Sequence, residues 1–144
     1  MTRATDRLDA LVAGREEAPP VVQTLRLGLL DAWEPGWVGK RWEPDPELLN
    51  GDGSLFGGYI AALADQLLAF AAMTVVPEGS AFRTINLSVQ FIRVGRAHPI
   101  LAEGRVTAQT TSLITVEASF FREDDKALIA RATAQQMVTP FATP

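Results

Sequence analysis

The sequence contains no cysteine and only one histidine, His98. The absence of cysteine excludes a disulfide framework, a thiolate nucleophile and thiolate metal ligands. A single histidine cannot form a histidine-rich metal cluster. We therefore expect no metal site.

Basic charge and long apolar runs are also scarce. Thirteen Lys and Arg stand against seventeen Asp and Glu, for a net charge of -4, and the basic residues are scattered. This pattern provides no basic stripe for nucleic acid and no polybasic segment for a membrane surface. The apolar run from Tyr59 to Met73 is too short to span a bilayer and is interrupted by Asp65. Residues 1–20 contain acids and lack the apolar core of a signal peptide, so we expect a cytoplasmic protein with no nucleic-acid or membrane partner.

The length of 144 residues and the apolar fraction of 47% are typical of one soluble domain. Residues 1–24 are expected to form an N-terminal helix and a linker. Leu8, Leu11 and Val12 have helical spacing, Gly14 is a stop signal, and "REEAPP" is the linker. Residues 25–144 are expected to form the single folded domain.

Within that domain the pattern predicts α+β structure. Two strand-like runs flank the turn residues 34–36, a loop covers residues 44–54, and residues 59–73 form a buried helix. Four segments in which every second residue shares one side follow, at residues 85–91, 100–109, 114–120 and 128–138. Because short turns join them, they predict an antiparallel meander against which the helix packs. A helix wrapped by a curved antiparallel sheet is the hotdog fold.

The first of these strands is expected to divide into two faces. Ile85, Leu87, Val89 and Phe91 share one side. Asn86 and Ser88 share the other side, and we expect Thr84 to project with them.

Several motifs resemble the hydroxybenzoyl-CoA thioesterase superfamily, and most closely its phenylacetate-pathway (PaaI-like) group. "LLNGDGSLFGGYIAALADQ" is similar to that group's helix entrance, in which Asn, Gly and a spacer precede His-Gly-Gly and then Leu-Ala-Asp. "FIRVG", "AEGRV" and "LIARATAQ" are similar to its strands. The resemblance covers roughly residues 25–138 and implies the hotdog fold and thioester hydrolysis.

The sequence departs from that group at two places. Phe56 stands where many relatives have histidine, and Val94 replaces the usual proline. "LFGG" and "VVPEGS" are similar instead to a bacterial medium-chain acyl-CoA thioesterase branch, so the subfamily stays open.

Thioester hydrolysis needs donors aimed at the carbonyl oxygen and a carboxylate that activates water or attacks the carbonyl carbon. Gly57 and Gly58 start the helix, where backbone N–H groups are unpaired and the helix dipole is positive. Asp65 is the candidate carboxylate. Eight residues of helix separate it from Gly57 by about 12 Å along the axis. One chain cannot apply both groups to one carbonyl, so the chemistry predicts a homodimer with antiparallel helices.

The resemblance implies two further catalytic candidates. Asn50 matches a loop asparagine that holds the water or the substrate, although Asn-Gly is also a common turn. Thr84 matches a strand hydroxyl that assists the carboxylate in some relatives, and it is equally compatible with a structural role. For Asp65 itself, the alternative is a cap or an ion pair inside the dimer.

Other residues are candidates for substrate binding. Leu55, Phe56, Gly58 and Tyr59 are expected to line an acyl pocket, whereas Leu63 is better explained by core packing. A second set is expected to contact coenzyme A, with a solvated turn as the alternative; it comprises Arg93, Gly95, Arg96, Thr111 and Ser112.

These features together predict an acyl-CoA thioesterase that hydrolyses an acyl or arylacyl thioester at a site shared by two subunits. It needs no cofactor, because coenzyme A is part of the substrate. The expected assembly is a homodimer, and the resemblance leaves a dimer of dimers open as the alternative. One rival is a non-catalytic acyl-CoA-binding protein. The other is a hotdog hydratase or dehydratase, which would require His98 to lie beside Asp65 across the dimer.

Overall fold

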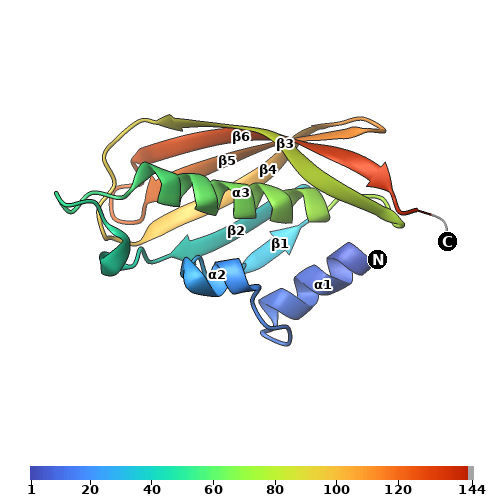
Figure 1. Cartoon of the computed structure of the whole chain (residues 1–144), viewed down its shortest axis with the longest axis horizontal. Helices are drawn as coiled ribbons and strands as arrows, with labels where there is room; N and C mark the ends of the chain where they lie inside the picture. Colours follow the sequence, from blue (N-terminus) through green and yellow to red (C-terminus); the bar gives the residue numbers. More distant parts are fainter. Residues whose placement is uncertain (143–144) are drawn as a thin grey trace.

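The computed structural model describes residues 1–142 and contains one six-stranded antiparallel sheet wrapped around a central helix (Figure 1). The helices are α1 (Arg3–Val12), α2 (Pro20–Thr24) and α3 (Gly57–Met73), with a 3₁₀ turn η1 (Pro46–Leu48). The strands are β1 (Ala32–Glu34), β2 (Trp37–Trp42), β3 (Ser80–Phe91), β4 (Ile100–Gln109), β5 (Leu113–Arg122) and β6 (Leu128–Pro140). This is the predicted hotdog fold, with the predicted first hairpin formed by β1 and β2.

The core lies between α3 and the inner face of the sheet. Leu63, Leu67 and Leu68 of α3 are fully buried, and the helix packs mainly on β4, β5 and β6. At Gly104 of β4 the helix comes so close that a Cβ atom would lie 3.1 Å from the carbonyl oxygen of Leu67. A glycine is therefore needed at this crossing. Within residues 1–142, no helix is long and apolar enough to cross a membrane.

The predicted meander is only partly correct. The strand order is β1-β2-β4-β5-β6-β3, so β4, β5 and β6 are consecutive neighbours but β3 pairs with β6 at the far edge. Segment 92–99 carries the chain from the end of β3 to the start of β4. The period-two pattern identifies which residues share a face of a strand, but it does not identify the neighbouring strand. For this reason the alternation could not reveal the position of β3.

A β-bulge at Ile85 changes the predicted faces of β3. Thr84 pairs with Gln136, and Asn86 pairs with Gln135, so Ile85 is the extra residue. One inserted residue reverses the alternation. Thr84 consequently faces α3, whereas Asn86 and Ser88 project from the opposite face, next to Gln135 and Thr133. The expectation that Asn86 and Ser88 project with Thr84 is therefore wrong. Leu87, Val89 and Phe91 do share one side, as predicted, and it is the side facing α3.

The N-terminal segment packs on the same core as the sheet. The predicted helix is present as α1, and Leu8 and Leu11 are buried with residues of the main domain. Asp9 at the middle of α1 accepts a hydrogen bond of 2.9 Å from Trp33 Nε1 of β1. The expected linker is followed by α2, which the sequence analysis did not predict. Pro20 is the first residue of α2, where its missing N–H has no cost.

Candidate active site

The first turn of α3 has hydrogen-bond donors without acceptors. Phe56 is the N-cap residue and its side chain makes no capping hydrogen bond. Phe56 O accepts from the N–H groups of Tyr59 and Ile60, but no acceptor among residues 1–142 is recorded for the N–H of Gly57 or Gly58. Unpaired N–H groups at a helix start, together with the positive end of the helix dipole, favour the binding of an anion or a polarised oxygen atom there.

A cavity of about 320 Å³ opens in front of this turn. Its lining comes from the segment before α3, the start of α3 and the end of β3 with the residues after it: Ser54, Leu55, Gly57, Ile60, Phe91, Ile92, Arg93, Val94 and Gly95. Leu55 is fixed there by its N–H, which donates to Gly95 O at 2.9 Å. A Cβ atom on Gly95 would lie 2.6 Å from Leu55 Cδ1, so the close packing depends on glycine.

The two candidate arginines near this cavity contact backbone carbonyls. Arg96 Nη1 donates to Asp52 O at 2.9 Å and thereby holds the loop that precedes α3. Arg93 Nη1 donates to Leu128 O at 2.8 Å, and Arg93 also lines the cavity. His98 is exposed in the same β3–β4 connection, and its N–H donates to Arg96 O.

Thr111 and Ser112 lie in the β4–β5 turn, at the other end of the molecule from Arg93. The nearby residue Gln109 donates from Nε2 to Val75 O, just beyond the C-terminal end of α3, at 3.1 Å. Gly95, in contrast, contacts Leu55 just before the start of α3. A single chain therefore does not bring the predicted coenzyme A contacts together.

Asn50 stabilises the loop before α3. Its Nδ2 donates to Ser54 Oγ at 3.0 Å and to Leu55 O at 3.3 Å. Ser54 Oγ in turn donates to Asp52 Oδ1 at 2.6 Å, and this hydrogen bond is the main cause of a lowered pKa of the Asp52 carboxyl. Asn50 thus lies close to the start of α3 with its side-chain amide donating within its own loop.

Asp65 is exposed rather than buried, which corrects the expectation of a helix buried all around. The residues of α3 that avoid full burial include a row spaced by four, Gly57, Ala61, Asp65, Ala69 and Met73. Successive residues of this row are neighbours on the helix surface, and each step turns the row by about 40° around the axis. The carboxylate therefore stands on the open stripe of α3, two turns along and about 80° around the helix from the unpaired N–H of Gly57.

Thr84 and Gln136 hold the Asp65 carboxylate from the sheet. Thr84 Oγ1 lies 2.9 Å from Asp65 Oδ1 and 2.9 Å from Gln136 Oε1. The hydroxyl has one proton and can donate to only one of these acceptors at a time. Gln136 is fully buried, and its Nε2 has no hydrogen-bond partner in the described part of the chain. If the Gln136 side-chain amide is rotated by 180°, its NH₂ group donates to Thr84 Oγ1. The Thr84 hydroxyl can then donate its own proton to Asp65.

A second apolar pocket, of about 260 Å³, lies on the other side of the helix start and is lined by Leu25, Leu48, Phe56, Gly58, Tyr59 and Ala62. Three of the four candidates expected to bind the acyl group thus line one pocket, namely Phe56, Gly58 and Tyr59, while Leu55 lines the other. Leu63 is fully buried, in agreement with a core role.

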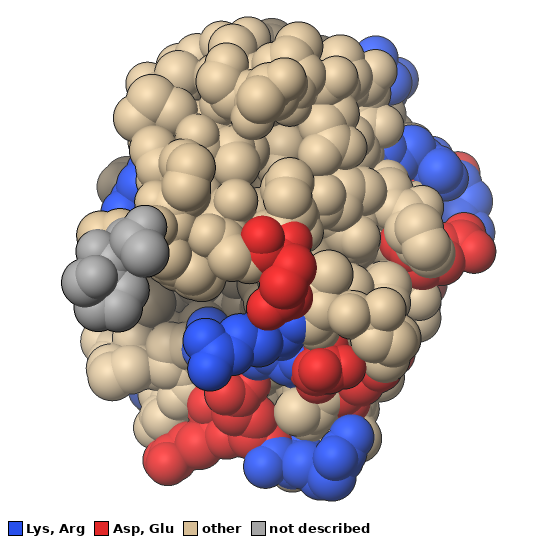
Figure 2. Space-filling view, turned by 90° about the vertical axis from the view of Figure 1, so that its right-hand side faces the viewer, with Lys and Arg blue, Asp and Glu red and all other residues tan. Residues whose placement is uncertain are grey.

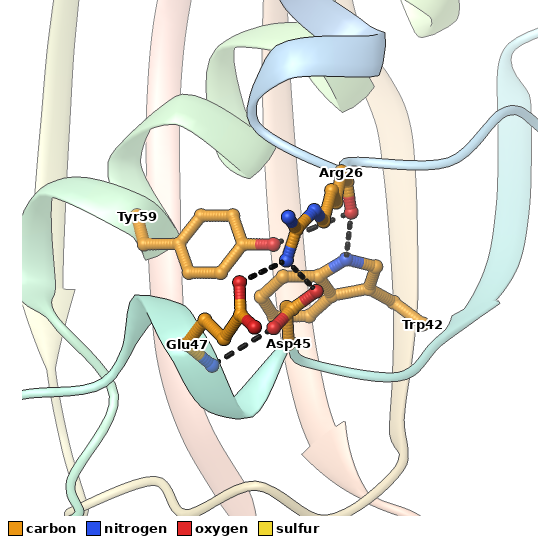
Figure 3. A network of polar contacts seen from close by, with 5 residues as sticks. All are labelled: Arg26, Trp42, Asp45, Glu47 and Tyr59. Atoms are coloured by element: carbon orange, nitrogen blue, oxygen red, sulfur yellow. Dashed lines mark hydrogen bonds and ion pairs between the residues drawn. The ribbon is translucent and has the colours of Figure 1, made fainter.

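A polar network behind this pocket keeps its wall in place (Figure 3). Tyr59 Oη and Trp42 Nε1 both donate to Arg26 O at 3.3 Å, and the rings of Tyr59 and Trp42 pack edge to face with centroids 4.8 Å apart. The Arg26 guanidinium pairs with Asp45 and Glu47, at the start of η1. Burial raises the pKa of the Tyr59 hydroxyl. The start of α3 is therefore tied to the segment around Arg26.

Sequence analysis missed a buried lysine near the site. Lys40 of β2 is 5% exposed and donates to Leu27 O, to Gly28 O and, at 3.0 Å, to Gln66 Oε1. Burial lowers the pKa of Lys40 to about 8. Gln66 directly follows Asp65 in α3 and donates to Gly28 O at 2.7 Å. Lys40 and Gln66 together join α3 to the 27–28 segment.

A long helix with an uncapped glycine start, crossing a curved antiparallel sheet, defines the class of hotdog proteins. A sequence model described as "Thioesterase superfamily" matches residues 52–129, from the loop before α3 to the start of β6. The chain belongs to this superfamily. No curated protein sequence matches it significantly.

Solved structures agree with the fold. A phenylacetic acid degradation-related protein from Ralstonia eutropha JMP134 is 24% identical with a TM-score of 0.79, and 90% of this chain and 98% of that chain are covered. A thioesterase family protein from Silicibacter pomeroyi is also 24% identical, with a TM-score of 0.80 and coverage of 92% and 98%. A Streptococcus mutans UA159 protein with bound acetyl-CoA is 25% identical, with a TM-score of 0.70 and coverage of 77% and 87%.

Proposed function

We propose that the protein hydrolyses an acyl or arylacyl coenzyme A thioester to the free acid and coenzyme A. The observation that carries this proposal is the open stripe of α3. It holds a pair of unpaired N–H donors at Gly57 and Gly58 and, two turns further on, a carboxylate oriented by Thr84. These are the donor and the base or nucleophile that thioester hydrolysis needs.

The complete site is formed by two copies of the chain. Within one chain the rise of α3 separates Gly57 from Asp65 by about 12 Å, too far for one carbonyl group. Two antiparallel α3 helices would place Gly57 of one subunit opposite Asp65 of the other, and would create two equivalent sites.

Strand β3 supports the pairing of two chains. It is twelve residues long and pairs with β6 on one side, which leaves an open sheet edge. Ile85 and Phe91 are 50% and 57% exposed on this strand. A long apolar edge strand is a surface that proteins cover by pairing. A second copy is the occupant that also completes the site.

The reaction in this site has a simple balance of bonds. The thioester carbonyl oxygen accepts a hydrogen bond from Gly57 N–H, which stabilises the negative charge that develops on it. Asp65 of the other subunit either takes a proton from the attacking water or attacks the carbonyl carbon itself. The carbon–sulfur bond then breaks, and the sulfur leaves as the thiol of coenzyme A after taking up a proton.

The cavity in front of Gly57 is the proposed entrance for the coenzyme A moiety. Its lining includes Arg93, two residues beyond the end of β3. Arginine is well suited to bind phosphate groups. The bound acetyl-CoA in the Streptococcus mutans protein, and the coenzyme A in a Streptococcus pneumoniae TIGR4 protein that shares the fold, are consistent with a ligand of this class.

The test is release of free thiol from a panel of aliphatic and aromatic acyl-CoA thioesters, with Asp65→Asn as the matched variant. We expect turnover by the natural sequence and a loss of about 10²–10⁴-fold in kcat for Asp65→Asn, the range for removal of a general base. Asparagine keeps the size of the side chain and can still accept the Thr84 hydrogen bond. Binding without turnover, or addition of water to an enoyl-CoA without thiol release, would reject the hydrolase proposal.

Single-turnover hydrolysis in ¹⁸O-labelled water, together with trapping of the acyl-enzyme anhydride, separates the two roles of Asp65. Attack by the carboxylate forms the anhydride, and label enters Asp65 when water then adds to the Asp65 carbonyl carbon. General-base catalysis forms no anhydride and puts the label only in the product acid.

A further inference from the structure

An apolar cavity of about 300 Å³ lies at the end of the molecule opposite to Gly57. It is enclosed by α1, the C-terminal end of α3, the start of β3 and Phe141. Most of its exposed wall is apolar, with Ala4, Met73, Val76, Pro77 and Phe82. The charged residues Arg3, Arg7 and Glu78 also line it. Figure 2 views this end and shows charged side chains in the lower half of the face and along its right-hand edge, while the middle of the upper half has none.

This cavity continues the stripe that carries the catalytic carboxylate. Met73 follows Asp65 by eight residues, with Ala69 midway, so the three form a row of neighbours that turns by about 80° around α3. On β3, Phe82 precedes Thr84 by two residues and faces α3 with it. A path from Asp65 and Thr84 along this face therefore passes the small side chain of Ala69 and reaches Met73 and Phe82.

We propose that this cavity receives the distal end of a linear fatty acyl chain whose thioester carbonyl sits at Asp65. The inference rests on the proposed function and names the substrate class within it. Asp65 and Met73 are separated by about 12 Å along the helix axis. An extended chain advances about 1.2 Å per bond, so an acyl chain of about ten carbons reaches the cavity. The substrates are medium-chain and longer saturated acyl thioesters.

Helix α1 is fixed firmly enough to act as a wall of this cavity. The backbone N–H of Arg3 donates to Glu78 Oε2 at 2.8 Å, which ties the first turn of α1 to the turn after α3. Leu8 and Leu11 are buried in the core, and Trp33 Nε1 holds Asp9. Ala4, on the first turn, presents only a methyl group to the cavity. A larger side chain at this position would occupy the space of several methylene groups.

The experiment compares kcat/KM for acyl-CoA substrates from butanoyl to tetradecanoyl. In the natural sequence we expect kcat/KM to rise from octanoyl to dodecanoyl. Ala4→Phe should lower the dodecanoyl value about tenfold and leave hexanoyl-CoA within about twofold, since each methylene in an apolar pocket changes discrimination by a factor of ten or more. Val12→Phe is the matched control, because Val12 is exposed on α1 and lies outside the cavity.

A second variant and a binding measurement make the outcome independent of Ala4. Phe82→Ala enlarges the cavity and should shift the preferred chain length upward. In the Asp65→Asn variant, S-dodecyl-CoA, a thioether that cannot be hydrolysed, should bind about tenfold more tightly than S-hexyl-CoA. This binding difference should be lost in the Asp65→Asn, Ala4→Phe double variant.

The outcomes separate this inference from the proposed function. If no thioester is hydrolysed but S-dodecyl-CoA binds tightly in an Ala4-dependent manner, the hydrolase proposal fails and the cavity assignment stands. If thioesters are hydrolysed with no dependence on chain length, or if Ala4→Phe and Phe82→Ala leave that dependence unchanged, the acyl chain lies elsewhere and this inference is overturned. Equal affinity for the two thioethers also overturns it.

Discussion

The Thr84 hydroxyl links the Asp65 carboxylate of α3 to the sheet. We predict that Thr84→Val lowers kcat about 10- to 100-fold and changes KM little, because a hydrogen bond to a charged group contributes about 1.5–3 kcal/mol. Valine has nearly the shape of threonine and removes only the hydroxyl. Steady-state kinetics with the best acyl-CoA substrate measures the effect.

Thr84→Ser is the matched control, since serine keeps the hydroxyl and should retain most of the activity. Equal activity of the serine and valine variants would show that the hydroxyl does not orient Asp65. A parallel fall in thermal stability for both variants would point to packing instead.

The buried ammonium of Lys40 gives a prediction about pH and stability. Its pKa is about 8 in the folded chain and 10.5 when exposed. Between these values the unfolded chain still holds the proton that the folded chain has released, so the free energy of unfolding rises with pH. We expect the natural sequence to gain up to about 3 kcal/mol relative to Lys40→Met between pH 7 and pH 10.5.

Urea unfolding of both proteins at several pH values measures this difference, and other titrating groups cancel in the comparison. This gain in unfolding free energy is absent below pH 8, because the folded and the unfolded chain both carry the charged lysine there. A difference in unfolding free energy that stays constant across the pH range would mean that burial does not lower the pKa of Lys40.

The start of α3 could be predicted from the sequence because its signal is local. The glycine pair followed by Asp65 specifies a helix start and a carboxylate with a fixed spacing, and the structure places both on one stripe. Lys40 and Gln136 were missed, although each interrupts a buried apolar alternation. Lys40 stands between Val38 and Trp42, and Gln136 stands between Ala134 and Val138. Their partners come from distant segments, which a pattern within one strand cannot identify.

At the start of α3, a single substitution can remove the backbone N–H of Gly57 without removing any other donor. Gly57 is the first helical residue, and Phe56 before it is already extended, with ψ of 128°. Proline fits the first position of a helix and lacks the N–H. We predict that Gly57→Pro lowers kcat about 10²–10³-fold, the usual effect of losing an oxyanion donor.

Gly57→Ala is the control for the added carbon atoms. A Cβ atom at position 57 would lie 3.1 Å from the ring of Phe91, which is exposed and can move. The alanine variant keeps its N–H and should retain activity within about tenfold of the natural sequence. Equally low activity of both variants, with unchanged circular dichroism, would assign the loss to the Phe91 contact.

Strand β3 provides a prediction about assembly. Leu87 is 37% exposed on the side of the edge strand that faces α3. We predict that Leu87→Asp weakens self-association about 100-fold or more, because a buried carboxylate without a partner costs several kcal/mol. Sedimentation velocity over a range of protein concentrations measures the change, and activity should fall with the dimer fraction.

Met137→Asp is the comparison variant. Met137 is 42% exposed on β6, where it pairs with Arg83 and Leu113 rather than with residues facing α3. It should leave both association and activity unchanged. Dissociation by Met137→Asp but not by Leu87→Asp would place the interface on the outer face of the sheet.

The arrangement of strands was less predictable than their existence. The alternation of apolar residues located all four long strands. For β5 and β6 it also identified the residues on the inner face. The bulge at Ile85 adds one residue to β3 without any turn residue to mark it, and so it reversed the expected direction of Asn86 and Ser88. The edge position of β3 depends on pairing with β6, which is distant in sequence, and local periodicity does not contain it.

The whole molecule is incomplete as a catalyst if the proposal is correct. Each chain would carry one donor set at Gly57 and one carboxylate at Asp65, in two different sites of a symmetric dimer. Loss of either group in every chain removes both sites. Loss of different groups in the two chains of a mixed dimer leaves one site with both groups intact.

Mixing two inactive variants therefore tests the shared site directly. Gly57→Pro and Asp65→Asn, each with low activity alone, should recover about a quarter of the natural activity after joint unfolding and refolding, because half of the dimers are mixed and each mixed dimer has one working site. Two Gly57→Pro, Asp65→Asn double-variant chains cannot form such a site and serve as the control. If each chain used its own Gly57 and Asp65, the mixture would stay as inactive as its components, and a dimer-shared mechanism would have to be abandoned.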